Sequence, residues 1–563
     1  MASQAVEVDK ARPGGRVLAD ALLAQGIDHV FAVPGESYLD VLDGLYAVRD
    51  RIRLVTCRFE AGAVNMAEAY GKLTGRPAAA MVTRGPGACH GAAGVHIAMQ
   101  DSTPLLLFVG QIPFAETDRD SFQEVDYRRM FGPLAKWVTQ IDDAARIPEL
   151  VAHAVDVATT GRPGPVVIAL SEEMQKHVVD VPDIGRAHVS APQPDPVALD
   201  RMAALLAGAR RPLAILGGSC WTAAGRAAVR DFLVGHDIPV AVGFRRQAVY
   251  DGRLPNFVGD LGVGSDPALV ARARDADLVL AIGTRLGEAT TQGYTLFKSG
   301  GVDTAGATAI VHVYPEASEI GRVFRTELGI VSELNAFARA AAALPKVAGS
   351  WGGWTRELRE LRDAAQAVPA YAGTLNLGAV MRELQDLAAP DAVFASDAGN
   401  FATWPVRFMD FGEHQRSIGP TNGGMGYGVP AGIAAAVAYP GRQVVVFVGD
   451  GGMLMTGQEV ATCFAEGVAP IVLVFNNGMY GTIRMYQERA YPGRVSGTRL
   501  VNPDFAKFME SFGGHGEVVS ATAEFGPAWA RAVASGKPAL IELRMDPEQI
   551  TSRATITQLR AGR

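Results

Sequence analysis

The chain has 563 residues, which is too long for one hydrophobic core and predicts several domains. Apolar residues make up 48% of it and charged residues 20%, which indicates a globular protein. The formal net charge of -7 argues against a general nucleic-acid binder.

The sequence contains no pattern for export or for a membrane. Its first fifteen residues are polar and charged, without the apolar segment of a signal peptide. Pro or Gly interrupts each apolar region before it reaches about 18 residues, so we expect no membrane span. The cysteines form no CxxC pair, which argues against a structural zinc site or a disulfide framework. They are Cys57, Cys89, Cys220 and Cys463. We therefore expect a reduced, cytoplasmic protein that binds neither nucleic acid nor membrane.

Short apolar runs alternate with alanine-rich helical segments along the whole chain. This alternation is typical of parallel sheets flanked by helices. The predicted strands are 29–33, 78–83, 104–110 and 165–170, then 212–218, 238–243, 278–283 and 309–315, and finally 392–397, 444–450 and 470–475. The sequence therefore predicts an α/β protein with three doubly wound parallel-sheet domains.

Two connecting regions separate these three groups of strands. One is a polar, proline-containing segment at 178–196, and the other lies at 344–354. The expected domains are 1–183, 195–345 and 365–550, followed by a C-terminal tail at 551–563. Each domain then has an ordinary size.

One predicted strand, in "VVVFVGDGG" at 444–452, ends on a carboxylate between glycines. Asp450 offers a hard anionic oxygen, and Asn477, after the next strand, offers a carbonyl oxygen. Magnesium prefers such ligands, completed by backbone oxygen, water and phosphate. Ligands bind at the carboxyl ends of parallel strands, and the N–H groups of Gly451 and Gly452 suit a phosphate there. The pattern predicts a metal-diphosphate site, although by itself Asp–Gly after a strand is also typical of a plain turn.

The segment after this strand has the pattern of a helix start. Thr456 and Glu459 form the T-x-x-E capping box, which predicts a helix that begins at Thr456. Gly467 is the predicted end of this helix.

The spacing between the two halves of the candidate site is itself a motif. Gly451 and Asn476 are separated by 24 residues, and Asn477 follows directly. Gly-Asp-Gly, a spacer in the mid-twenties and Asn-Asn resemble the thiamin diphosphate signature. The resemblance to thiamin diphosphate-dependent enzymes covers nearly the whole chain, in the order pyrimidine-binding, central and diphosphate-binding domain. It implies thiamin diphosphate and Mg²⁺ as cofactors, with Asp450, Asn477 and Met479 at the metal.

The same resemblance implies roles for further residues. Glu60, in "LVTCRFEAGAVNMAEAYGKLTG", falls on the glutamate that activates the aminopyrimidine, although a glutamate at a helix start also favours the helix dipole. Met425, in "TNGGMGYGVPAGIAAA", falls on the residue that props the bent cofactor; the alternative is a core methionine. The other implied cofactor-binding positions are Gly35, Gly399, Asn400, Gly424, Tyr480 and Gly481.

Within this family the chain is most similar to the acetolactate synthase group. Phe122 and Gln123, in "VGQIPFAETDRDSFQEVDYRRMFGPLAKW", fall on substrate-side catalytic positions, and Lys136 matches a lysine of that group. The resemblance implies decarboxylation of a 2-oxo acid and addition of the remaining fragment to a second carbonyl. Tyr486 is a departure, because acetolactate synthases carry at this place a tryptophan that selects 2-oxobutyrate.

The loop "VTRGPGACHG" also departs from the group. Arg84 replaces a small residue there and either binds an acidic substrate group or pairs with a surface carboxylate. Cys89 and His90 raise the alternative of a Cys/His catalytic dyad, which we disfavour because adjacent side chains seldom point together.

The central domain carries a mixed signal for FAD. The "GMLGMHG" segment of flavin-containing relatives is absent, and residues 254–264 occupy its place. Arg285, in "AIGTRLGEATTQ", does match those relatives. No GxGxxG fingerprint is present. We therefore expect no tightly bound FAD.

Together these observations predict an enzyme that decarboxylates a small 2-oxo acid and ligates the product to another carbonyl compound. The family resemblance implies a homo-oligomer, a dimer or tetramer, with active sites between subunits. Two alternatives remain: a non-synthetic 2-oxo acid decarboxylase or 2-hydroxy carbonyl lyase, and a non-catalytic thiamin-binding regulatory protein.

Overall fold

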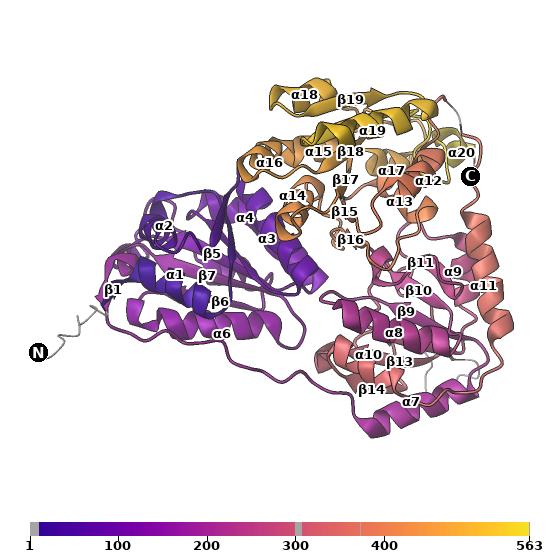
Figure 1. The fold of residues 1–563 in the computed structure, drawn as a ribbon, viewed down its shortest axis with the longest axis horizontal. Helices are drawn as coiled ribbons and strands as arrows, with labels where there is room; N and C mark the ends of the chain where they lie inside the picture. Colours follow the sequence, from indigo (N-terminus) through magenta and orange to yellow (C-terminus); the bar gives the residue numbers. More distant parts are fainter. Residues whose placement is uncertain (1–10, 299–306, 372, 562–563) are drawn as a thin grey trace, which may run out of the picture. The chain divides into compact units, whose positions relative to one another are not determined.

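The computed structural model describes residues 11–298, 307–371 and 373–561. The chain forms two compact units, residues 1–189 and residues 190–563 (Figure 1). The first unit contains one six-stranded parallel sheet, and the second contains two. The predicted fold of three α/β domains is therefore confirmed, while the exact domain boundaries remain a prediction.

The sheet of the first unit has the strand order β3-β2-β4-β5-β7-β6. Its strands in chain order are β2 (His29–Ala32), β3 (Arg53–Thr56), β4 (Ala78–Val82), β5 (Leu105–Gln111), β6 (Trp137–Ile141) and β7 (Pro165–Ser171). The helices are α1 (Gly14–Ala24), α2 (Leu39–Tyr46), α3 (Glu60–Thr74), α4 (Pro86–Asp101), α5 (Tyr127–Phe131) and α6 (Ile147–Thr159). A short antiparallel pair joins β1 (Arg12–Pro13) to β8 (Val178–Val179).

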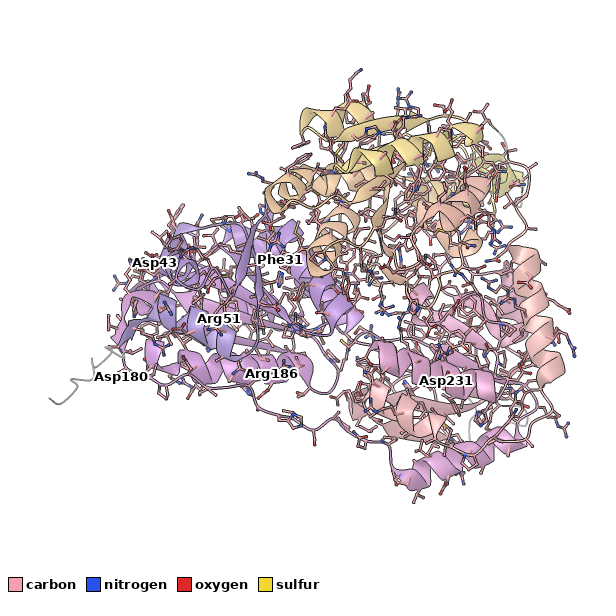
Figure 2. All side chains as sticks on the ribbon, in the orientation of Figure 1. Phe31, Asp43, Arg51, Asp180, Arg186 and Asp231 are labelled. Atoms are coloured by element: carbon pink, nitrogen blue, oxygen red, sulfur yellow. The ribbon has the colours of Figure 1, made fainter. Side chains whose placement is uncertain are left out.

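Burial explains which strands the sequence pattern revealed. Helix α1 packs on α2 and α6, whereas α3 packs on α4, so both faces of the central strands are covered. Strand β4 is buried at every residue, as expected of a strand inside a doubly wound sheet. In Figure 2, Phe31 of β2 lies in this interior, while Asp43 and Arg51 project from the surface. The unpredicted strands β3 and β6 lie at the two edges and are only partly buried.

The second unit begins with the central domain, whose sheet has the order β11-β10-β9-β12-β13-β14. The strands are β9 (Pro212–Leu216), β10 (Val240–Gly243), β11 (Phe257–Leu261), β12 (Leu278–Ile282), β13 (Ala309–Tyr314) and β14 (Leu328–Val331). The helices are α7 (Pro196–Gly208), α8 (Ala223–Gly235), α9 (Pro267–Ala273), α10 (Leu334–Ala342) and α11 (Gly352–Ala365). Helix α11 begins inside the region expected to be a connection.

The third domain has the order β16-β15-β17-β18-β20-β19, the same chain-order pattern as the first unit. The strands are β15 (Val393–Ser396), β16 (Arg416–Ile418), β17 (Val444–Gly449), β18 (Ile471–Asn476), β19 (His515–Val519) and β20 (Ala539–Arg544). The helices are α12 (Leu377–Leu387), α13 (Thr403–Phe408), α14 (Gly428–Ala438), α15 (Asp450–Thr456), α16 (Val460–Glu466), α17 (Gly481–Ala490), α18 (Phe505–Ser511), α19 (Phe525–Ser535) and α20 (Ile556–Ala561).

This strand order determines where each sheet can hold a ligand. In the first unit the connections reverse direction between β2 and β4, and in the third domain they reverse between β15 and β17. Doubly wound sheets bind ligands outside the carboxyl ends of the strands at such a reversal. Gly35 follows β2, and Asp450 directly follows β17.

The predicted helix start at Thr456 is confirmed in position, because Thr456 is the N-cap residue of a short 3-10 helix at Gly457–Glu459 that leads into α16, but the predicted capping box does not form. Helix α15 already begins at Asp450, and Thr456 is its last residue. The Thr456 hydroxyl donates to the carbonyl of Gly426 at 2.9 Å, and the side chain makes no capping hydrogen bond. The predicted end at Gly467 is confirmed, because this glycine adopts φ +66° directly after α16. Among the described helices, none is long and apolar enough to cross a membrane.

Candidate active site

In the first unit, the candidate residues gather at the reversal between β2 and β4. Gly35 packs so closely on Thr83 that a Cβ at this position would lie 2.5 Å from the Thr83 Cβ. The hydroxyls of Ser37 and Thr83 are 2.9 Å apart. Gly35 therefore allows the loop after β2 to lie against the end of β4.

Glu60 is the first residue of α3, as the sequence predicted. Its side chain is 15% exposed, and its Oε2 lies 2.9 Å from His90 Nδ1 on α4. His90, noted in the sequence only as half of a dyad with Cys89, thus faces the candidate catalytic carboxylate. Its Nδ1 is engaged by Glu60, so this nitrogen does not pair with the neighbouring thiol.

Gln123 and Phe122 lie in the loop between β5 and α5. Gln123 has φ +66°, an uncommon backbone conformation for a residue other than glycine, and it packs on Gly85. A Cβ at Gly85 would lie 2.9 Å from the Gln123 Cβ, and one at Gly87 would lie 3.5 Å from Glu60 Oε1. The start of α4 therefore contacts both Gln123 and Glu60. Phe122 is 73% exposed, so its ring is not part of the core.

Two basic residues of this unit are engaged in internal contacts. Arg84 pairs with Glu172 at 2.8 Å and with Glu36 at 3.3 Å, which favours the ion-pair interpretation over recognition of an acidic substrate. Lys136 donates to the carbonyl of Thr160 at 2.8 Å and to that of Val157, at the end of α6. A lysine at the C-terminus of a helix satisfies its last carbonyls and complements its dipole.

In the third domain, Asp450 opens α15 at the carboxyl end of β17. Its Oδ2 accepts hydrogen bonds from the Gly478 N–H at 2.9 Å and from Asn502 Nδ2 at 2.7 Å. Burial raises the pKa of Asp450, although these donors oppose that shift. The sequence pattern assigned no role to Asn502, although this residue opens the segment "NPDF".

The two consecutive asparagines after β18 have different surroundings. The side chain of Asn476 contacts Asn502 at 3.0 Å and Glu542 at 2.7 Å, so it holds neighbouring segments together. Asn477 accepts the N–H of Met479 at 3.2 Å and lines the cavity described below. Asn476 therefore holds neighbouring segments together, whereas Asn477 is available to a ligand.

A cavity of about 390 Å³ lies at the carboxyl end of this sheet. It is lined by these predicted residues: Gly399, Asn400, Met425, Asp450, Gly451, Gly452, Asn477, Met479, Tyr480 and Gly481. Gly424 lies between the lining residues Gly423 and Met425. Residues that sequence reasoning missed also line it, among them Arg245 and Asp260 of the central domain and Ile550 after β20.

The glycines of this cavity permit close approach of neighbouring groups. A Cβ at Gly451 would lie 2.6 Å from the ring of Tyr480, and one at Gly452 would lie 2.9 Å from Asp397 Oδ2. Both glycines belong to the first turn of α15, whose N–H groups have no partner within the helix. A carboxylate, an amide and a helix N-terminus thus meet at one wall of the cavity, which is the donor set that a metal-bound diphosphate requires.

Met425 is presented to this cavity by a loop with two glycines at positive φ, Gly423 and Gly426. It is 39% exposed, which excludes the alternative of a core methionine. Asp397 holds the loop by accepting the N–H groups of Gly426 at 3.0 Å and Gly428 at 3.3 Å. Burial raises the pKa of Asp397 to about 6, although these donors oppose that shift.

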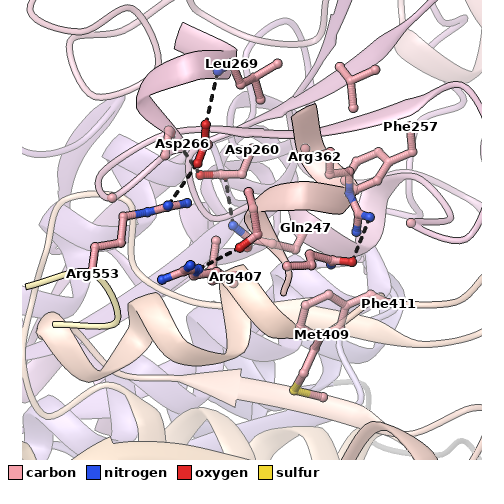
Figure 3. Close-up of a pocket in the computed structure, with 18 residues that line it drawn as sticks. Gln247, Phe257, Asp260, Asp266, Leu269, Arg362, Arg407, Met409, Phe411 and Arg553 are labelled. Atoms are coloured by element: carbon pink, nitrogen blue, oxygen red, sulfur yellow. Dashed lines mark hydrogen bonds and ion pairs between the residues drawn. The ribbon is translucent and has the colours of Figure 1, made fainter. Parts of the chain in front are cut away.

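A second cavity, of about 60 Å³, lies between the central and third domains (Figure 3). Arg553, from the segment after β20, reaches Asp266 of the central domain at 2.9 Å. Arg407 donates to the carbonyl of Ala365 at 2.8 Å. These contacts link the two domains, and Asp260 lines both cavities.

Comparison with known proteins matches all three domains. Residues 12–130 match the family model "Thiamine pyrophosphate enzyme, N-terminal TPP binding domain". Residues 199–341 match the central domain, and residues 397–543 match the C-terminal TPP binding domain, of the same enzymes. Glu60 and Gln123 fall in the first match, and Asp450 and Asn477 fall in the last.

Curated relatives are similar over most of their length. The acetolactate synthase large subunit of Parasynechococcus marenigrum is 28% identical over 94% of this chain and 87% of the relative. The isozyme 2 large subunit of Escherichia coli is 27% identical over 95% of each chain. A probable acetolactate synthase large subunit of Methanocaldococcus jannaschii is 27% identical over 95% of this chain and 92% of the relative. The chain therefore belongs to the thiamine pyrophosphate enzyme family.

Proposed function

We propose that this protein is a thiamine pyrophosphate- and Mg²⁺-dependent enzyme that decarboxylates a small 2-oxo acid and ligates the remaining fragment to a second carbonyl compound. The observation that carries the proposal is the wall of the 390 Å³ cavity, where Asp450, Asn477 and the start of α15 meet. Relatives that span nearly the whole chain are acetolactate synthases, which supports this reaction class.

The residues at this wall suit a divalent ion bound to a diphosphate. Asp450 supplies a carboxylate oxygen and Asn477 an amide oxygen, and Met479 lines the cavity beside them. Among the described residues, no cluster of three His, Cys, Asp or Glu side chains could hold a metal. The ion would therefore depend on one carboxylate, with amide, backbone and phosphate oxygens completing the coordination that Mg²⁺ prefers.

The other cofactor contacts follow from the lining of the cavity. Gly451 and Gly452 offer their N–H groups to the diphosphate, and Gly399 and Asn400 also line the cavity. Met425 supports the bend of the coenzyme. When bound, thiamine pyrophosphate supplies a carbanion at its thiazolium C2 that adds to the 2-oxo acid carbonyl.

Glu60 is proposed to contact the aminopyrimidine ring nitrogen and to exchange a proton with it. In this family the pyrimidine-binding domain of one chain faces the diphosphate-binding domain of another. We therefore infer a homodimer or homotetramer in which Glu60 of one chain serves the cavity of a second chain. Phe122 and Gln123 would belong to the substrate side of the same site.

A second candidate is a non-synthetic decarboxylase or a lyase that cleaves 2-hydroxy carbonyl compounds. It is favoured by Tyr486, which lines the cavity at the place where acetolactate synthases carry a tryptophan. Product analysis with pyruvate distinguishes the two: acetolactate supports the ligase, whereas acetaldehyde supports the decarboxylase. The absorption spectrum of the purified protein tests the expectation that no FAD is tightly bound.

The decisive test combines two variants with a matched control. Glu60→Gln should lower turnover of a 2-oxo acid panel by at least about 100-fold, the scale of general acid–base catalysis, while leaving coenzyme affinity nearly unchanged. Asp450→Asn should instead weaken Mg²⁺-dependent coenzyme binding. The control is Glu149→Gln, an exposed helix glutamate paired with Arg146. Wild-type turnover in both site variants would refute the proposed function.

A further inference from the structure

Glu60 is held by a histidine from the neighbouring helix. His90 Nδ1 lies 2.9 Å from Glu60 Oε2. The His90 ring also packs on the ring of Phe59, with centroids 4.9 Å apart. Phe59 is the last residue before α3, so His90 contacts the start of this helix through an aromatic ring and through a carboxylate.

The spacing of α3 and α4 that permits this contact depends on two glycines. A Cβ at Gly94 would lie 2.6 Å from Val64 Cγ1, and one at Gly91 would lie 3.1 Å from Val64 Cγ2. Any larger residue at Gly94 would push the helices apart, because protein interiors are close-packed. Packing of Val64 on these glycines therefore sets the register that brings His90 to Glu60. The contact results from the core of the first unit, although the His90 side chain is 51% exposed.

The two carboxylate oxygens of Glu60 have different surroundings. Oε2 contacts His90, whereas Oε1 has no hydrogen-bond partner among the described residues and lies beside Gly87. His90 therefore leaves one oxygen available to a ligand.

We propose that His90 is a positioning residue for Glu60, which orients the carboxylate through Nδ1 and leaves Oε1 for the ring nitrogen of the coenzyme. This inference rests on the proposed function. When a proton passes from Glu60 Oε1 to that ring nitrogen, one O–H bond breaks and one N–H bond forms, while His90 keeps Oε2 in place.

Three variants separate this role from simple packing. In His90→Asn the amide nitrogen is as many bonds from the backbone as Nδ1, so the donor to Glu60 is kept. In His90→Gln the amide nitrogen is one bond further away, and His90→Leu has no donor. The readouts are the dissociation constant of the coenzyme and the rate at which the C2 proton of bound coenzyme exchanges with deuterium. Both are measured with saturating Mg²⁺, and neither requires a substrate.

Loss of the donor should slow this exchange by about 10- to 100-fold, the effect of one hydrogen bond to a charged group. We expect this in His90→Gln and His90→Leu, while His90→Asn stays within about threefold of wild type. In the Glu60→Gln background, His90→Leu should cause no further loss, because the two residues act as one unit.

Wild-type exchange in His90→Gln, or an equal loss in the Glu60→Gln background, would overturn the inference. His90→Asn as slow as His90→Leu would also overturn it, because the loss would then not depend on the donor. If His90→Leu does not fold, His90→Gln serves as the test variant, because glutamine is a polar side chain at an exposed position.

A separate measurement does not depend on the coenzyme. In the unliganded protein, the Nδ1 nitrogen resonance of His90 should change when Glu60 is replaced by Gln. The control is His153 of α6, whose ring packs on Trp137 and whose resonance should not change. An unchanged resonance would contradict the contact itself. Failure of the proposed function would give a different result. The wild-type protein would bind no coenzyme, although the His90 resonance still changes in Glu60→Gln.

Discussion

Asn502 donates a hydrogen bond from Nδ2 to Asp450 Oδ2 over 2.7 Å, and the same nitrogen lies 3.0 Å from Asn476 Oδ1. One amide therefore orients the candidate metal ligand and ties it to the end of the neighbouring strand. Removal of this kind of supporting contact typically lowers metal affinity 10- to 100-fold.

We predict that Asn502→Ala weakens the Mg²⁺ affinity of the protein by about 10-fold in the presence of coenzyme, because Asp450 loses its orienting donor. Titration with Mg²⁺, followed by coenzyme binding, measures the effect. Asn376→Ala is the matched control: it removes the N-cap of α12 and costs about 1 kcal/mol of stability without touching the cavity. Equal metal affinities in the two variants would contradict the prediction.

Asp397 predicts a pH dependence of stability. Its pKa is raised from 3.8 to about 6 by burial, so the folded protein binds the proton more tightly than the unfolded chain does. Between pH 4 and 6 the folded state therefore carries the extra proton, and its stability falls as the pH rises through this window. The expected loss is on the order of 3 kcal/mol from this group.

Asp397→Asn should remove this contribution, because asparagine does not titrate. Unfolding midpoints of wild type and variant at several pH values between 4 and 6 provide the measurement. The advantage of the wild type over the variant should shrink as the pH rises. A difference that is independent of pH would show that Asp397 is ionised in the folded protein throughout this range.

Arg84 is predicted to support the fold rather than the substrate. Arg84→Gln and Glu172→Gln remove the two sides of the same 2.8 Å ion pair. Both should lower stability by about 1 to 3 kcal/mol, because each removes the shorter ion pair of a charge that is at least partly buried. The KM values of the two variants for the 2-oxo acid should agree within about twofold, because neither substitution changes how the substrate binds. A rise in KM confined to Arg84→Gln would instead assign this arginine to the substrate.

We predict that an ion pair with Glu488 holds the segment after β20 in place. Arg560 of α20 donates to Glu488 of α17 at 2.7 Å and 2.8 Å, and the Glu488 side chain is 1% exposed. Hydrogen bonds, first of all from Arg560, lower the pKa of Glu488 to about 2. The stabilisation is present above the ordinary glutamate pKa of 4.5 and is lost as the pH falls from there towards 2.

Arg560→Gln should release α20 and make the C-terminal segment about 10-fold more sensitive to chymotrypsin at neutral pH, because a hydrogen-bonded charge pair is lost. Lys507→Gln is the control, since it breaks an exposed pair with Asp504. Equal cleavage rates for the two variants would show that other contacts, such as the packing of Ile556 on Met485, hold the segment.

The unpredicted strands of the first sheet share a physical cause, which does not apply to the equally unpredicted β20, an interior and buried strand of the third domain. Strands β3 and β6 lie at sheet edges, where only part of each strand is buried, so they lack a continuous apolar run. The capping box at Thr456 failed for another reason. A capping box forms only when its side chains are free, and the Thr456 hydroxyl is bonded to Gly426, thirty residues earlier in the chain.

The sequence by itself determined the three parallel sheets and the chemistry at their carboxyl ends. Buried parallel strands are apolar throughout, and Asp450, Asn477 and Glu60 directly follow strands or begin helices, so chain order alone brings each to a sheet edge. Only the tertiary structure decided which side chains support them. Asn502 reaches Asp450, His90 reaches Glu60, and Asp397 reaches the loop of Met425 through packing between distant segments. Such contacts depend on helix spacing and loop closure, which no local pattern of residues encodes.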